Sequence, residues 1–215
     1  NVPSLSKDVA SKLEPYLQLA GRLGVLLGHF ETNDVRAVRV TCTGQAGQLG
    51  VRPIAHAALG GYLSQHSEEP VNPISAPYEA KARGVNLVEV SEEAIRGFAS
   101  SVTVQVEGGK GVYSATGTLS AAGEPRLVEL NGYELDAVIE GTTLVMHNDD
   151  QPGVIGQVGT VLGERAINVS RMQVGLDAKS GRALALWNVD SDVPAEAVEA
   201  LAGIAHVKSV MVAKL

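Results

Sequence analysis

The chain has 215 residues and a mass of 22.3 kDa, which fits one large or two small domains, because single domains usually hold roughly 100–200 residues. With 45% hydrophobic and 19% charged residues it can bury a core, and its net charge of −7 argues against nucleic acid as a partner. The single cysteine, Cys42, excludes an internal disulfide framework and a zinc site built from several thiolates.

Targeting and membrane signals are also missing from the sequence. No apolar run approaches the roughly 18 residues of a membrane-spanning helix, and the N-terminus lacks the pattern of a signal peptide. We therefore expect a soluble, cytoplasmic protein with no membrane partner. Glycine is abundant, with 24 residues, and suits close packing between helices.

The first part of the chain predicts helices followed by strands. Apolar residues recur at three- and four-residue steps through the first 30 residues, and Pro15 is expected to start a second helix there. Residues 36–43 alternate in polarity, which predicts a half-buried strand with Cys42 in the core. Further helices are expected at 49–65 and between Asn72 and Gly84, and further strands at 86–90, 102–106, 113–119 and 126–130.

After Gly141 the pattern changes to a compact unit. It predicts strands at 142–147, 167–174, 182–189 and 207–212, with helices at 154–165 and 194–202. Ile155, Val158, Val161 and Leu162 are expected on the inner side of the first of these helices. The order β-α-β-β-α-β predicts an antiparallel sheet with both helices on one face. The expected fold class is α+β: a mixed α/β domain over residues 1–140 with an N-terminal linker helix, then a ferredoxin-like domain over residues 141–215.

Signatures of catalysis are missing. The glycines at 153, 156, 159 and 163 lack the G-x-G step of a dinucleotide site, so we interpret them as small residues that let a helix lie close on its sheet. The five histidines are scattered and are interpreted as structural or surface residues: His29, His56, His66, His147 and His206. No nucleophile motif occurs. We therefore predict no catalytic, metal-binding or cofactor-binding residue in this chain.

The segment from Asn148 to Val154 carries the main chemical signal. Carboxamide and carboxylate side chains follow a strand, and a helix then begins with its free N–H groups directed into the same space. The helix start suits an α-carboxylate and Asp150 suits an α-ammonium, so the segment can hold a zwitterion. The alternative is that Asp149 or Asp150 only caps the helix and Pro152-Gly153 only forms a turn.

Two longer motifs resemble a known family. The stretch Asp-x-Pro-Gly-Val-Ile-Gly-x-Val-Gly-x-x-Leu from Asp150, followed by Ala-Ile-Asn-Val-Ser, resembles an ACT domain, a small module that binds amino acids. Residues 19–26, 71–77, 117–119 and 128–133 resemble the intervening, allosteric-substrate-binding domain of long-form D-3-phosphoglycerate dehydrogenases. The resemblance covers nearly the whole chain. It implies the regulatory C-terminal part of such an enzyme, with the NAD-binding and catalytic domains upstream.

The resemblance also implies a ligand. Members of the family oxidise 3-phosphoglycerate with NAD in serine biosynthesis, and L-serine or a similar small amino acid would be the feedback effector. By motif position the effector would contact Asn148, Asp150 and Asn168, with the amides around Gly153 and Val154. Since Asn168 falls between the first helix and the second strand of the ACT domain, we expect it at the sheet end beside the Asn148–Asp150 turn, supplied by a neighbouring chain. An ACT-like sheet leaves an edge strand open, and the N-terminal apolar stripe offers another contact, so we expect a homo-oligomer through the ACT and intervening domains.

Other interpretations remain open. Relatives with an anion site in the intervening domain carry basic residues near the Asn131-Gly132 turn, but here Tyr133, Glu134 and Val138 follow, and only Arg126 is basic. Such a turn is a poor phosphate cradle. The regulatory part of an iron–sulfur L-serine dehydratase can share both modules, although Cys42 alone cannot hold a cluster. A stand-alone amino-acid-binding module is a third alternative.

Overall fold

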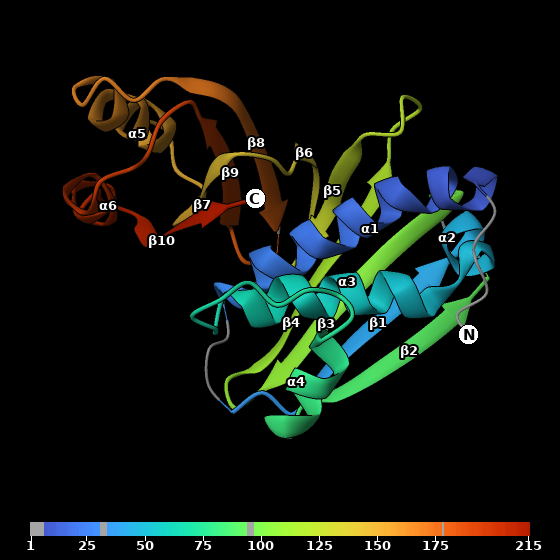
Figure 1. Ribbon diagram of the computed structural model, residues 1–215. Helices are drawn as coiled ribbons and strands as arrows, with labels where there is room; N and C mark the ends of the chain where they lie inside the picture. The colour runs from blue at the N-terminus through green and yellow to red at the C-terminus, as the bar shows by residue number, and fades with distance from the viewer. Residues whose placement is uncertain (1–6, 31–33, 94–96, 178) are drawn as a thin grey trace. The chain divides into compact units, whose positions relative to one another are not determined.

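The computed structural model describes residues 7–30, 34–93, 97–177 and 179–215, and the chain divides into two compact units (Figure 1), Asn1–Asn131 and Gly132–Leu215. Both units combine helices with a sheet, so the predicted α+β class is confirmed. The second unit begins with a strand that the sequence analysis missed, β6 (Tyr133–Val138). The second compact unit therefore starts at Gly132, before Gly141. The predicted boundary between the two domains near Gly141 stays a prediction.

One long helix, α1 (Lys7–Gly28), opens the first unit in place of the two helices expected. Pro15 lies inside it, where a proline removes a backbone hydrogen bond and costs roughly 3 kcal/mol. The apolar stripe nevertheless continues on both sides of the proline, with Leu13, Tyr16 and Leu19 all buried. Because each fully buried large apolar side chain contributes roughly 1.5–3 kcal/mol, burial of the stripe outweighs the local penalty.

Two helices replace the single helix expected near residues 49–65. They are α2 (Gly44–Leu49) and α3 (Val51–Ser64), and Gly50 separates them with a φ of 116°. An L-residue with a side chain is strained at this angle, whereas glycine adopts it readily. The expected short helix is present as α4 (Ala76–Ala82).

The sheet of the first unit contains β1 (Ala37–Thr43), β2 (Asn86–Glu92), β3 (Ser100–Gly108), β4 (Gly111–Leu119) and β5 (Pro125–Leu130), in the order β2-β1-β3-β4-β5. The β1–β2 pair is parallel and the other pairs are antiparallel. Helices α1 and α3 lie side by side over one face of the sheet (Figure 1). Val38, Val40 and Cys42 are fully buried, which confirms the predicted alternation and the core position of the cysteine.

Glycines let α1 and α3 approach unusually closely. A Cβ added to Gly24 would lie 2.0 Å from the carbonyl oxygen of Ala58, and one added to Gly61 would lie 2.1 Å from that of Gly21. Any side chain at these two positions would collide with the backbone of the facing helix. The structure therefore confirms close helix packing through small residues.

The second unit continues with β7 (Thr142–Asp149), α5 (Val154–Gly163), β8 (Val169–Asp177), β9 (Arg182–Val189), α6 (Ala195–Ala202) and β10 (Val207–Lys214). The four-stranded sheet has the order β10-β7-β9-β8, and every pair in it is antiparallel. One core joins α5 and α6 to the sheet, with Val158, Leu201 and Trp187 among its buried residues. Both helices thus lie on one face, as predicted.

Two expectations for α5 were wrong. Its buried residues are Val154, Val158 and Leu162, whereas Ile155 is half exposed. The inner stripe repeats every four residues from Val154, so Ile155 is turned roughly 100° away from it. A Cβ added at glycine 156, 159 or 163 would meet no atom within 4 Å. These three glycines therefore face open space and do not bring the helix close to the sheet.

Candidate functional site

The end of β7 positions the polar residues that the sequence singled out. The strand is two residues longer than predicted, so Asn148 and Asp149 belong to it. The backbone N–H of Asp149 donates to the carbonyl of His206, and that of Asp150 donates to the carbonyl of Gly181, both at 2.9 Å. This segment is thus held between the loop before β10 and the hairpin that joins β8 to β9.

The side chains of Asn148 and Asp150 have different surroundings. Asn148 is only 7% exposed, and its Nδ2 donates to the carbonyl of Asp149 at 2.7 Å, which leaves Oδ1 as an acceptor. Asp150 is exposed, and its carboxylate forms no ion pair within the part of the chain that the structure describes. It is therefore able to bind a cation from solution.

Asp149 has cationic partners that the sequence analysis missed. Its Oδ2 lies 2.8 Å from Nζ of Lys208 and 3.4 Å from Nδ1 of His206. The hydrogen bond from Lys208, helped by the one from His206, lowers the pKa of Asp149 below its ordinary value. No spacing in the sequence links these residues, because strand pairing between β7 and β10 brings them together. The carboxylate of Asp149 is thus occupied, in contrast to that of Asp150.

The start of α5 offers backbone donors next to these side chains. Gly153 precedes the helix with a φ of 91°, a left-handed conformation that favours glycine. The N–H groups of Ile155 and Gly156 have no acceptor among the described residues. Because the helix dipole adds partial positive charge there, this end can hold a carboxylate. The amide of Val154 makes only a long contact, 3.4 Å, with the carbonyl of Gln151.

Asn168 lies at the other end of the sheet, so its expected place beside the Asn148–Asp150 turn within one copy is wrong. Asp149 pairs with Arg182 at one end, whereas Val169, the first residue of β8, pairs with Val189 at the opposite end. Nine residues of β8 separate the two ends by roughly 25–30 Å. Helix α5 carries the chain back before β8 begins, which is why residues on either side of the helix cannot share a sheet end.

The backbone of Asn168 is fixed, but its side chain is not engaged. Its N–H donates to Oδ1 of Asp190 at 3.3 Å, and its carbonyl accepts from the N–H of Asp190 at 3.2 Å. The carboxamide of Asn168 makes no hydrogen bond within the described ranges. It can therefore serve as both donor and acceptor for another molecule.

Metal binding, pyrophosphate binding and membrane insertion were also considered for the described part of the chain. No cluster of three or more histidine, cysteine or acidic side chains there could hold a metal ion. In the turn before α5, the exposed carboxylate of Asp150 would repel a pyrophosphate. None of the described helices combines the length and apolar character needed to cross a membrane.

Comparisons with known proteins match both units. The family model for the D-3-phosphoglycerate dehydrogenase intervening domain matches residues 12–131, and that for the ACT domain matches residues 142–206. The D-3-phosphoglycerate dehydrogenase of Synechocystis sp. is 32% identical over 216 residues, covering 100% of this chain and 39% of the relative. The enzymes of Bacillus subtilis and Methanocaldococcus jannaschii are each 31% identical, over 98% and 100% of this chain and 40% and 41% of their own lengths. The chain thus spans about two fifths of the length of these relatives.

Proposed function

We propose that this chain, which belongs to the D-3-phosphoglycerate dehydrogenase family as its C-terminal regulatory part, binds L-serine or a similar small amino acid through its ACT domain. One observation carries the proposal. The end of β7 and the start of α5 bring to one end of the sheet the carboxamide of Asn148, the exposed carboxylate of Asp150 and backbone N–H groups that have no acceptor among the described residues.

The three groups match the three parts of a small polar amino acid. The amides at the start of α5, around Gly153 and Val154, would receive the α-carboxylate. Asp150 would accept from the α-ammonium, because Asp149 is already paired with Lys208. Oδ1 of Asn148 is an acceptor for the ammonium or for the serine hydroxyl.

A second copy would complete the site. β8 is an edge strand, and it exposes Met172 and Leu176. Two such edges paired around a two-fold axis run antiparallel, so the beginning of one β8 lies beside the end of the other. Asn168 of the second copy would then reach the sheet end that carries Asn148 and Asp150. This pairing accounts for the position of Asn168 far from that turn in its own copy.

For the whole protein we propose NAD-dependent oxidation of 3-phosphoglycerate in serine biosynthesis, in a cytoplasmic homo-oligomer that serine inhibits. The names of the relatives support the dehydrogenase over the serine dehydratase. A ligand held between two copies binds the paired arrangement better than the separated one, and such differences transmit typically about 1–3 kcal/mol between sites. This chain by itself would not form NADH from 3-phosphoglycerate. NADH formation by the purified chain would contradict the proposal that it is a regulatory part without dehydrogenase activity.

Calorimetry with L-serine tests the binding proposal. We expect heat of binding for the unchanged chain and at least about a tenfold loss of affinity in both Asp150→Ala and Asn168→Ala, since each substitution removes a charged or amide contact. Asp192→Ala is the matched control, because Asp192 is an exposed carboxylate of the same domain that pairs with Lys214. No heat with the unchanged chain, or unchanged affinity in both variants, would refute serine binding at this site.

A further inference from the structure

Two histidines meet where helices α1 and α3 end side by side. A Cβ added to Gly28, the last residue of α1, would lie 2.6 Å from Cγ of Gln65, the first residue after α3. His29 comes immediately after Gly28, and His66 comes immediately after Gln65. The two imidazoles therefore occupy equivalent positions at the contact between the helix ends.

One ring nitrogen of each imidazole is buried without a partner. Nε2 of His29 and Nε2 of His66 form no hydrogen bond with any of the described residues. A neutral imidazole tolerates this environment, because its single proton can lie on Nδ1 and leave Nε2 as a bare acceptor. A protonated imidazole carries N–H on both nitrogens, so Nε2 would become a buried donor of a charged group with no acceptor, which costs more.

Local contacts hold both residues at the helix ends. The backbone N–H of His29 donates to the carbonyl of Leu26 at 3.3 Å, and that of His66 donates to the carbonyl of Leu63 at 2.9 Å. The ring of His66 packs against the ring of Tyr62 with centroids 5.0 Å apart and an interplanar angle of 60°. Bringing the His66 ring into water would therefore break its packing against α3.

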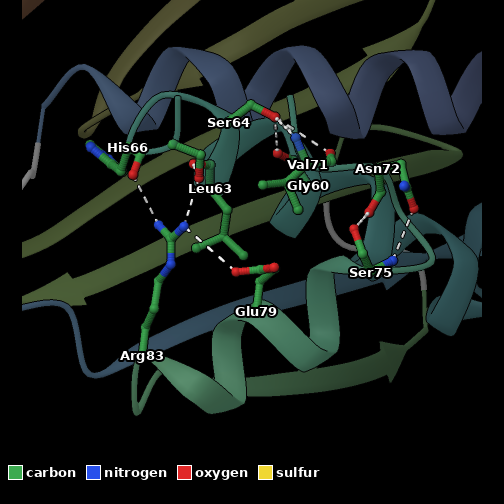
Figure 2. Close-up of polar contacts among 10 residues, drawn as sticks. Gly60, Leu63, Ser64, His66, Val71, Asn72, Ser75, Glu79 and Arg83 are labelled. Atoms are coloured by element: carbon green, nitrogen blue, oxygen red, sulfur yellow. Dashed lines mark hydrogen bonds and ion pairs between the residues drawn. The ribbon is translucent and has the colours of Figure 1, made fainter. Parts of the chain in front are cut away.

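The charged group that contacts His66 is a cation. The guanidinium of Arg83 donates to the carbonyl of His66 at 3.1 Å and to Oγ of Ser67 at 2.7 Å. It also lies 3.7 Å from the carboxylate of Glu79, and Figure 2 shows Arg83 extending from the end of α4 toward both residues. Arg83 thus already neutralises the partial negative charge at the end of α3, and a second cation on His66 would be repelled.

Other titratable groups near the helix ends supply no counter-charge to the imidazoles. Tyr113 of β4 stacks on Phe30, which follows His29, with ring centroids 5.6 Å apart. Asp34 and Lys110 lie at the turn between β3 and β4. Neither imidazole forms a hydrogen bond or an ion pair with any of these groups in the described part of the chain.

The pKa values of both histidines agree with this geometry. Burial lowers the pKa of His29 below its ordinary 6.5, and the neighbouring His66 lowers it further. Burial also lowers the pKa of His66, with an additional effect from Arg83. The partial negative charge at a helix C-terminus acts in the opposite direction, so burial and like charge outweigh it here.

We propose that His29 and His66 form a pH-sensitive switch between the ends of α1 and α3. The helix ends stay in contact while both imidazoles are neutral, and they separate locally when the imidazoles take up protons, because each new N–H then reaches water. The open form binds these protons more tightly than the closed form does. The closed contact is therefore fully stable above the ordinary pKa of 6.5 and loses stability as the pH falls below it. The switch lies within the first unit and does not depend on serine binding.

Hydrogen–deuterium exchange of the full chain tests the switch. Exchange is followed by mass spectrometry at about pH 7.5 and about pH 5.5 and is corrected for the intrinsic rates. At one unit below the ordinary pKa, each histidine that stays neutral in the closed form favours the open form by up to about tenfold. We expect the opening equilibrium of residues 26–30 and 63–67 to rise at least about threefold at the lower pH, and that of strand β3 to stay the same.

Substitutions identify the groups that respond to pH. His29→Phe combined with His66→Phe keeps two rings that stay neutral, so this double variant should lose the pH response while its circular dichroism at neutral pH is unchanged. His206→Phe is the matched control, because His206 lies in the second unit beside Asp149, and it should keep the response.

An NMR titration of the unchanged chain measures both imidazoles without any substitution. Each pKa should lie below 6.5, and Arg83→Gln should raise that of His66 because a repelling cation is removed. Equal opening at both pH values in the unchanged chain would overturn the proposal. A pH response that persists in the double variant, or a pKa of 6.5 or above for both histidines, would overturn it as well.

Discussion

Replacing Gly24 by alanine should destabilise the first unit, although alanine is the better helix former. Gly24 lies in α1 where this helix crosses α3, and a Cβ there would lie 2.0 Å from the carbonyl oxygen of Ala58 and 2.9 Å from the N–H nitrogen of Tyr62. Both atoms belong to the backbone of α3, so no side-chain rotation relieves the collision. The helices themselves have to move.

The size of the effect follows from the required movement. Ordinary contacts begin at 3.4 Å, so α1 has to shift by about 1.4 Å from the present 2.0 Å. A gap of 0.5–1 Å already forfeits roughly a quarter to a half of the dispersion energy of each contact. Overpacking typically costs about 1–3 kcal/mol, and a backbone obstacle places Gly24→Ala at the upper end or above it. The gain in helix propensity, roughly 0.5–1 kcal/mol, offsets only part of this loss.

Gly21→Ala is the matched control in the same helix. A Cβ at Gly21 meets only the carbonyl oxygen of Ala57, at an ordinary 3.8 Å. This variant should therefore be more stable than the unchanged chain by roughly 0.5–1 kcal/mol, because only the propensity gain remains. The two variants should differ by about 3 kcal/mol, which corresponds to a difference of roughly 1–2 M in the urea midpoint at a slope of about 2 kcal/mol/M.

Urea unfolding followed by far-ultraviolet circular dichroism measures these shifts. Fluorescence of Trp187, the single tryptophan, reports separately on the second unit, where the residue is buried. If Gly24→Ala and Gly21→Ala shift the urea midpoint in the same direction by similar amounts, close packing of α1 against α3 does not exclude a side chain at position 24.

Two further predictions concern titratable groups. Burial raises the pKa of the Cys42 thiol to about 12, so iodoacetamide at pH 8 should label it only after unfolding, as mass spectrometry can show; rapid labelling of the folded chain would contradict its core position. The hydrogen bond from Lys208 lowers the pKa of Asp149 below its ordinary 3.8, so this pairing stabilises the fold above that pH and the stabilisation is lost as the pH falls through the folded value. Lys208→Met should raise the pKa of Asp149 toward 3.8 in an NMR titration, while Lys214→Met should not, and an unmoved Asp149 in the first variant would disprove the pairing.

Most of the helices and strands, and the candidate residues at the end of β7, could be predicted from patterns in the amino-acid sequence. Alternating polarity predicted β1 with Cys42 inside, and the β-α-β-β-α-β order predicted a sheet with two helices on one face. The candidate residues at the end of β7 and the start of α5 could be identified because a polar turn before a helix is a local sequence pattern. Such features depend on neighbours within a few positions along the chain, and for this reason a pattern in the sequence reveals them.

Features that depend on residues far apart along the chain could not be predicted in this way. Pro15 lies within one continuous helix because α1 buries its stripe on both sides of the proline. The charge of Asp149 is neutralised by Lys208 on another strand, and Asp150 has no such partner among the residues that the structure describes. Asn168 lies at the far end of the sheet because α5 reverses the chain before β8 starts. Strand pairing and helix packing join residues many positions apart, and their geometry is set by the whole fold rather than by spacing along the chain.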